Sequence, residues 1–246
     1  MARTIATLAL ALGLAVTTAQ AGTLILVQPA PLAKDMPALP RIAGALTSAD
    51  AKINTALAKE DASWRAFLKD CHDQAGATFD MERSNQVVMR GPGYFAVTIG
   101  YSYDCGGAHP DAGSIALVYD LNTGWPVNWA QLLPKALVDS TSTDTAGDGS
   151  TIGLISSKVL QKIYVRKALA ALDGADRKDC ANTLYQPGLT FQVWPDAKAG
   201  GLMFQPNLPH VDMACGDPQL FSVPTLKSLG VASPLLSAIE AAHAAR

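Results

Sequence analysis

Four separated cysteines constrain this chain more than any other feature, because they decide what can hold the fold together. No two of them form a C-x-x-C pair, so a zinc ribbon or a thioredoxin-type redox site is poorly supported. An even number of such cysteines is typical of disulfides made in an oxidising compartment. We therefore predict two disulfides among Cys71, Cys105, Cys180 and Cys215.

These four cysteines can pair in three ways. Two lie in each half of the chain that follows the first 21 residues, and this locality favours Cys71–Cys105 and Cys180–Cys215. Each bridge would close a loop of about 35 residues and contribute about 3–4 kcal/mol to stability on the chain-entropy model. The expected fold is thus one that two short-range bridges can lock.

The first 21 residues have the organisation of an export signal. Arg3 gives a positively charged start, residues 5–16 are apolar, and Ala19 and Ala21 form an A-x-A cleavage site. This apolar stretch is too short to cross a bilayer, which requires about 20 residues, so an uncleaved anchor is the weaker alternative. We predict cleavage after Ala21, and a mature protein without a transmembrane anchor in the periplasm or outside the cell.

Length and charge limit the classes of function. The chain has 246 residues, 49% of them hydrophobic, and a formal net charge of −2. This length supports one sizeable core and does not require two. There is no basic excess to neutralise phosphates, so we expect no nucleic-acid partner. There is also no run of lysine or arginine that would mark a membrane-surface patch.

Hydrophobic periodicity predicts an α+β fold, in which an antiparallel meander sheet is packed by two main helices within a single domain. Residues 1–21 are the signal peptide, residues 22–46 an extended lead-in, and residues 47–246 the domain. Residues 77–121 contain alternating and β-prone segments that predict the strands of the meander, and residues 189–208 have the pattern of a later hairpin.

Two segments have the helical period. The first helix is expected from about Ser48 to Asp70, with Thr47 and Asp50 as its capping box. The second is expected over residues 152–174. Between them, residues 139–151 are small and polar and are expected to form an exposed loop or a hinge. Within them, residues 144–151 resemble a calcium loop only faintly, because the spaced acidic ligands and the terminal Glu are missing.

The segment "YSYDCGGAHPDAG", residues 101–113, concentrates residue types that suit recognition. Glycine pairs allow backbone conformations that other residues avoid, and Pro110 pushes His109 toward an extended backbone. A bridged Cys105 would fix the base of the loop, and a fixed loop is how a scaffold presents binding side chains. The predicted binding residues are Tyr101, Tyr103, Asp104, Gly106, Gly107, His109 and Asp111.

His109 admits three interpretations. It can hold the loop in shape through hydrogen bonds, it can contact a ligand, or it can act with Asp104 or Asp111 as a general base or a partial metal site. No H-E-x-x-H or G-x-S-x-G motif occurs, and no serine lies in a nucleophile-elbow context. We therefore predict no catalytic residue, no metal and no cofactor, and favour structure and recognition.

The same region resembles the RsiV-type extracytoplasmic domain family. That family occurs in the lysozyme-sensing anti-sigma factor RsiV and as the accessory region of the peptidoglycan deacetylase PdaC. The resemblance is specific around residues 101–133, loose elsewhere, and does not include the cysteines. The matching positions are Gly106, Gly107, Ala108, His109, Asp120, Thr123, Gly124, Leu132 and Leu133.

The resemblance implies an α+β fold and a place outside the cytoplasm, and it transfers no catalytic residue. The chain shows neither the transmembrane helix of the anti-sigma factor nor a separate deacetylase domain, so we expect only the extracytoplasmic domain to be shared. The resulting hypothesis is a non-enzymatic recognition module of the cell envelope, binding a lysozyme-like protein or a glycan fragment. The alternative is a cell-wall hydrolase or deacetylase-associated enzyme that uses the His109 loop.

Overall fold

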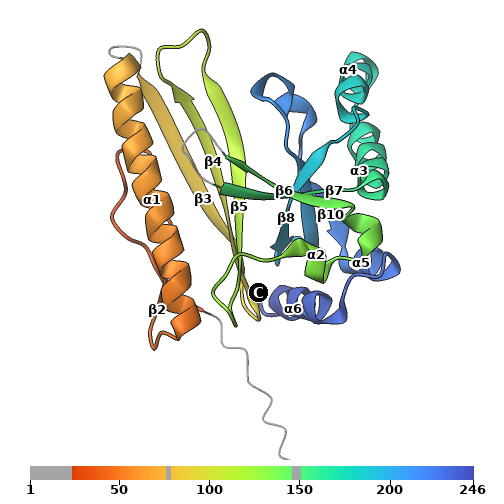
Figure 1. Cartoon of the computed structure of the whole chain (residues 1–246), viewed down its shortest axis with the longest axis horizontal. Coiled ribbons are helices and arrows are strands. Elements are labelled where there is room, and N and C mark those ends of the chain that lie inside the picture. The colour runs from red at the N-terminus through yellow and green to blue at the C-terminus, as the bar shows by residue number, and fades with distance from the viewer. Residues whose placement is uncertain (1–23, 76–78, 146–150) are drawn as a thin grey trace, which may run out of the picture.

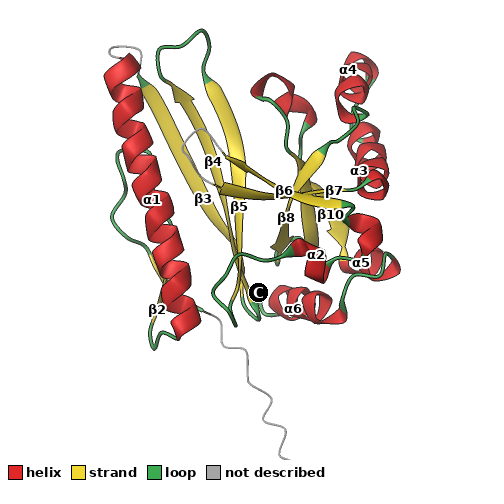
Figure 2. Ribbon diagram, in the orientation of Figure 1, coloured by secondary structure: helices red, strands yellow, loops and turns green. Residues whose placement is uncertain are grey.

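Two antiparallel sheets of different size form the centre of the molecule, and helices cover their outer sides (Figure 1). The computed structural model describes residues 24–75, 79–145 and 151–246. The predicted signal peptide and its cleavage position lie outside the described residues. Together the elements make the expected single α+β domain, with its strands in antiparallel sheets (Figure 2).

The N-terminal region, residues 24–120, contains the predicted meander. Its three strands pair in the order β3-β4-β5, and α1 covers one face of the sheet. A small ribbon of β1 and β2 lies against α1. The elements are β1 (Ile25–Val27), β2 (Arg41–Ala43), α1 (Ser48–Ala75), β3 (Asp80–Arg90), β4 (Tyr94–Asp104) and β5 (Asp111–Asp120).

The first helix begins at Ser48, as expected. In the predicted capping box, the Thr47 amide donates to Asp50 Oδ2 at 2.8 Å and the Asp50 amide donates to Thr47 Oγ1 at 3.1 Å. The helix continues past the expected Asp70 to Ala75, because its sequence contains no proline or glycine before that point. This extension carries Cys71 to the end of the sheet.

The C-terminal region, residues 129–244, is built on a five-stranded sheet in the order β10-β9-β8-β7-β6. Strands β8 and β9 form the predicted hairpin. The elements are α2 (Trp129–Leu132), the 3₁₀ turn η2 (Lys135–Leu137), β6 (Ser140–Thr145), β7 (Thr151–Ser156), α3 (Lys158–Ala170), α4 (Gly174–Leu184), β8 (Thr190–Asp196), β9 (Gly201–Pro206), the 3₁₀ helix η3 (His210–Cys215), β10 (Gln219–Ser222), α5 (Val223–Ser228) and α6 (Ser233–Ala244).

Two expectations for this region were wrong. Residues 140–145, expected as loop or hinge, form strand β6, and its partner β7 covers residues 151–156, of which 152–156 were expected to begin the second helix. Helix α3 starts only after Ser157, whose Oγ accepts a hydrogen bond from the Leu160 amide at 3.2 Å. The chain then forms a separate helix, α4, whose polar sequence carries almost no helical period.

Buried side chains form two clusters, one on each side of the three-stranded sheet. Phe95 and Val97 pack toward Trp64 of α1 in the first cluster. The second cluster fills the C-terminal region and extends to Met89 and Val118, at one end of the sheet face that points away from α1. Leu154 of β7 belongs to the first cluster, so the two regions share their cores.

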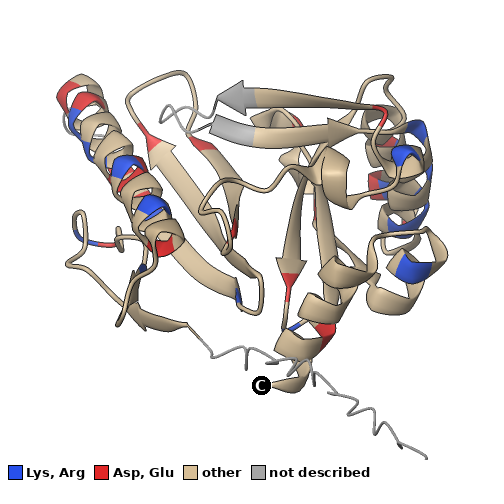
Figure 3. Cartoon of the chain, turned by 60° about the horizontal axis from the view of Figure 1, so that its bottom comes forward, with Lys and Arg blue, Asp and Glu red and all other residues tan. Residues whose placement is uncertain are grey.

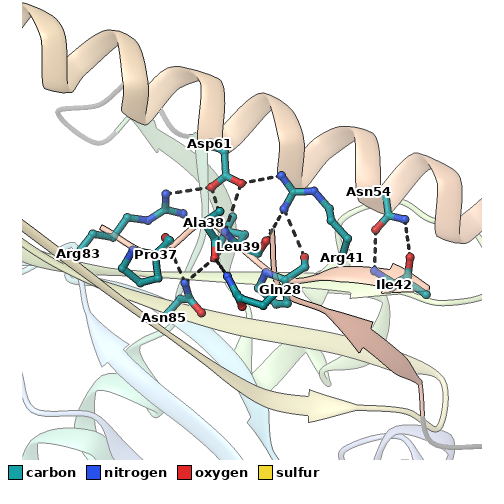
Figure 4. Close-up of polar contacts among 11 residues, drawn as sticks. Gln28, Pro37, Ala38, Leu39, Arg41, Ile42, Asn54, Asp61, Arg83 and Asn85 are labelled. Atoms are coloured by element: carbon teal, nitrogen blue, oxygen red, sulfur yellow. Dashed lines mark hydrogen bonds and ion pairs between the residues drawn. The ribbon is translucent and has the colours of Figure 1, made fainter. Parts of the chain in front are cut away.

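A buried carboxylate attaches the lead-in to the rest of the N-terminal region (Figure 4). The Asp61 side chain on α1 accepts hydrogen bonds from the Leu39 amide, at 3.1 and 3.2 Å. It also pairs with Arg41 Nη2 at 2.6 Å and with Arg83 Nη1 at 3.0 Å. Because Asp61 is almost completely buried, these protein donors replace water around its carboxylate.

Candidate functional site

The predicted loop connects β4 to β5 at the exposed end of the three-stranded sheet. Its base is fixed by the Cys71–Cys105 disulfide, which joins the end of α1 to the end of β4. The Gly106 amide donates to Asp104 Oδ1 at 2.8 Å, and Gly106 has a φ of 77°, a conformation that favours glycine. Gly107 is exposed and does not adopt a positive φ.

His109 lies at the exposed tip of this loop, so it does not hold the loop in shape from a buried position. Its Nδ1 atom is 3.1 Å from the Pro110 carbonyl oxygen, so its hydrogen bond is local to the loop. Its ring stacks on that of His210, with centroids 5.9 Å apart and an interplanar angle of 11°. The loop therefore meets η3, which belongs to the other half of the chain.

Asp111 is the polar centre of this contact. The Tyr103 hydroxyl donates to Asp111 Oδ2 at 2.7 Å, and the Ala112 amide donates to Asp111 Oδ1 at 2.8 Å. His210 Nδ1 lies 3.1 Å from the same Oδ1 atom. The residue that pairs with Asp111 is thus His210 and not His109, and Asp104 is bonded to Gly106 instead.

Tyr101, another of the predicted binding residues, lies on the face of the sheet that packs against α1. Its ring lies 5.3 Å from Trp64 and stacks on Tyr103 at 6.1 Å. The tyrosine crosses the neighbouring strand at Gly113, where a Cβ atom would come within 2.4 Å of the phenolic oxygen. Because Gly113 has no side chain, Tyr101 can extend across β5 and reach the cleft beside that strand.

A cleft of about 400 Å³ lies between the end of β5 and the segment that joins β9 to η3. Both disulfides support its walls: Cys71–Cys105 fixes the β4–β5 loop, and Cys180–Cys215 ties η3 to α4. Both pairings are the predicted ones. The lining is mainly polar, and its side chains with hydrogen-bonding groups are Tyr101, Asp111, Ser114, Gln192, Gln205, Asn207 and His210.

The Gln192 side chain and the segment after β5 occupy the free edge of β5. Gln192 Nε2 donates to the Ser114 carbonyl oxygen and its Oε1 accepts from the Ala116 amide, both at 2.9 Å. Further along, the Val127 amide donates to the Val118 carbonyl oxygen at 2.9 Å. An exposed strand edge usually invites pairing with another strand, so these contacts protect β5 from it.

The cleft presents hydrogen-bonding groups from several elements. The one serine that lines the cleft, Ser114, donates to Gln205 Oε1 at 2.7 Å. Among the residues that the structure describes, no group of three His, Cys, Asp or Glu side chains could hold a metal ion. Within the same residues, no helix is long and apolar enough to span a membrane. What remains is a cleft lined by hydrogen-bonding groups on two walls that disulfides support.

The structure brings together part of the predicted set of binding residues. Tyr101 and Asp111 line the cleft and the Tyr103 hydroxyl donates to Asp111, whereas His109 contacts this group through its ring, which stacks on His210. The sequence places His210 two residues before Asp212, but the Asp212 carboxylate accepts a hydrogen bond from the Thr183 hydroxyl. His210 contacts the Ala112 amide of β5, which lies 98 residues earlier in the chain. No local sequence pattern indicates that contact.

Comparison with known proteins places the fold. No protein-family model matches the chain, and no curated protein matches it. The crystal structure of a DUF3298 family member from Bacteroides fragilis superposes with a TM-score of 0.52 at 11% identity, covering 90% of this chain and 97% of that one. A DUF3298 family protein from Pseudomonas aeruginosa gives a TM-score of 0.42 at 16% identity over 70% of both chains. The first match shows that the fold is that of a DUF3298 protein.

Proposed function

We propose that this protein is an exported, non-enzymatic recognition module of the cell envelope, which binds a lysozyme-like protein or a glycan fragment at the cleft between β5 and η3. The RsiV-type resemblance around residues 101–133 supports this class, and the two disulfides are compatible with a place outside the cytoplasm. The fold likeness to a DUF3298 protein is consistent with it and names no ligand.

The observation that carries the proposal is the Asp111–His210 pair at the mouth of the cleft. Each side chain is 37% exposed, so both can exchange their contacts with water for contacts with a ligand. They come from opposite walls, and each wall is supported by its own disulfide. Such preorganisation reduces the ordering that binding would otherwise require.

Capture experiments test this proposal. The purified protein is incubated with insoluble peptidoglycan and, separately, with immobilised lysozyme, and the bound fraction is compared for the wild type, Asp111→Asn and His210→Ala. We expect capture by one of these ligands and at least a fivefold loss in both variants. The matched control is His72→Ala, because His72 stands 3.8 Å from Asp73 in a similar exposed pair on α1. A bound fraction that is the same for the wild type, Asp111→Asn and His210→Ala would contradict the proposal.

The alternative is a cell-wall hydrolase or deacetylase-associated enzyme that uses the His109 loop, favoured by the proximity of two histidines and a carboxylate. It predicts release of reducing ends or acetate from peptidoglycan by the purified protein. The His109→Ala variant would abolish that release while retaining both folding and capture. Absence of turnover in the wild type would eliminate this alternative.

A further inference from the structure

A larger cavity, of about 570 Å³, lies next to the cleft between the two sheets, along the face of the three-stranded sheet that points away from α1. Ser114 and Gln205 line both spaces, so the two adjoin, and together they are called the groove. One wall is this face, with Ser84, Gln86, Thr98, Gly100 and Ala116. The other wall is the β8–β9 hairpin, where Trp194 is paired with Met203 and Gln192 with Gln205.

This layer does not have the composition of a packed core. Where two sheets face each other, their inner side chains normally interdigitate as an apolar core. Here that holds only at one end, around Met89 and Val118. Toward the β4–β5 loop the facing positions are serine, threonine, glycine and glutamine, and a groove remains between the sheets.

Charge is scarce in the groove. Among the described residues, no lysine or arginine lines either cavity, and the carboxylates and imidazoles that line them are those of Asp196, Asp111 and His210. The charged residues of the molecule concentrate on α1 and on the helices of the opposite side, as Figure 3 shows. A phosphate or a strongly acidic polymer would find no cation here, so the groove suits an uncharged ligand.

Two hydrogen-bond donors inside the groove have no partner among the described residues. Gln205 uses its Oε1 atom to accept from Ser114, while its Nε2 atom donates to none of them. The indole N–H of Trp194 likewise makes no hydrogen bond to them. Both residues are only 6% exposed as a whole, but neither donor is among the buried side-chain atoms that lack a partner, so both donors are open to solvent. Water or a ligand that offers oxygen acceptors would satisfy them.

We propose that this groove binds a neutral glycan whose sugars carry acetamido groups. The proposal rests on the proposed function and specifies its ligand. An acetamido carbonyl oxygen is an acceptor for the Trp194 and Gln205 donors, and its methyl group fits the adjacent apolar side chains of Met203 and Ala116. A peptide strand is less well matched, because Gln192 and the segment after β5 already occupy the backbone groups of the β5 edge.

Titration calorimetry with defined oligomers tests the ligand class. The purified protein is titrated with chitotetraose, the β-1,4-linked tetramer of N-acetylglucosamine, and with cellotetraose, which has the same backbone without acetamido groups. A blocked tetraglycine peptide supplies amide carbonyls without sugar rings. We expect binding of chitotetraose at least tenfold tighter than that of either comparison ligand. Equal affinity for cellotetraose, or preference for the peptide, would overturn the proposal.

Two variants place the ligand in the groove. Trp194→Phe removes the indole donor and keeps a ring, whereas Gln205→Glu keeps the acceptor for Ser114 and removes the amide donor. Each is expected to bind chitotetraose about five- to tenfold more weakly, the effect of one lost hydrogen bond. Melting curves show whether each variant folds, and either folded variant is sufficient. Trp125→Phe is the control, because Trp125 is exposed and lies outside the groove.

The outcomes separate this inference from the proposed function. If peptidoglycan or lysozyme is captured through Asp111 and His210 but chitotetraose does not bind, the recognition module stands and the glycan groove is wrong. The groove is also wrong if chitotetraose binds equally well to both groove variants, or if Trp125→Phe abolishes binding. If no ligand is captured in either experiment, both proposals fail.

Discussion

The N-terminal and C-terminal regions are each closed by one disulfide over nearly the same distance along the chain, 34 and 35 residues, yet they are held together differently. The N-terminal region contains the buried charged residues Asp50, Asp61 and Arg83. Among the described residues of the C-terminal region, the buried polar side chains are the neutral Ser157, Gln192 and Gln205.

This difference follows from the amount of apolar side-chain surface that the helices of each region bury against its sheet. Helices α3, α5 and α6 contribute buried side chains to one large cluster over the five-stranded sheet. One long helix covers the three-stranded sheet, and the lead-in outside it has only two short strands. Polar anchors such as Asp61 therefore complete the N-terminal region, and we expect it to respond to charge removal as the C-terminal region does not.

Removal of the Asp61 carboxylate should give the largest effect. Asp61→Ala leaves Arg83 buried and the Leu39 amide without its acceptor, so we expect a loss of about 3–5 kcal/mol in the free energy of unfolding. Urea denaturation measures it. The control is Asp73→Ala on the same helix, where the partner Lys69 is exposed, and its denaturation midpoint should hardly change. Equal effects of the two substitutions would contradict the anchoring role.

Removal of each disulfide tests whether the two bridges stabilise their regions equally, by restricting the unfolded chain. Because the closed loops are almost equally long, the paired changes Cys71→Ser with Cys105→Ser and Cys180→Ser with Cys215→Ser should each cost about 2–4 kcal/mol. Denaturation under oxidising conditions compares them. A difference of more than about 2 kcal/mol would show that residual structure or local packing, rather than loop length, decides their contribution.

Glycine substitutions compare the two regions at single positions. Gly113→Ala places a Cβ atom against the Tyr101 ring, which Trp64 and Tyr103 hold in place, and should cost about 1–3 kcal/mol. Gly153→Ala in β7 meets no atom within 4 Å and should be neutral or slightly stabilising. If Gly113→Ala is also neutral, the Tyr101 side chain moves freely, and its place at the cleft is not fixed.

The same contrast explains which parts of the structure could be predicted from the sequence. Helix α1, the β3–β4–β5 meander and both disulfides were predicted, because periodicity and spacing are local signals that the structure retains. The β6–β7 hairpin was missed because a small polar strand resembles a loop, and because β7 runs into α3 with only Ser157 between them. His210 was missed as a partner of Asp111 because the contact exists only once the two regions pack together.

High pH offers the smallest and most selective comparison, through one buried tyrosine in each cluster. Burial raises the pKa of Tyr119 to about 12, with a minor contribution from the charge of Glu60. Burial also raises the pKa of Tyr164, and the charge of Asp217 adds to it. In the unfolded chain both phenols titrate near pH 10. The folded state therefore holds these protons more tightly than the unfolded state, and its stability falls as pH rises above 10.

For Tyr119 this stability is fully present below pH 10 and is lost as pH rises through about 12, so about 1 kcal/mol should be gone at pH 11. Tyr119→Phe should remove that loss at little cost near neutral pH, because the Tyr119 hydroxyl has no hydrogen bond to the described residues. Tyr164→Phe should also reduce the pH dependence, but at neutral pH it costs about 1 kcal/mol, since the Tyr164 hydroxyl donates to the Asp217 carbonyl oxygen at 2.7 Å. Urea denaturation at pH 8 and pH 11 separates the two. A Tyr119→Phe variant whose stability falls as steeply as that of the wild type would show that this phenol is not protected by the N-terminal cluster.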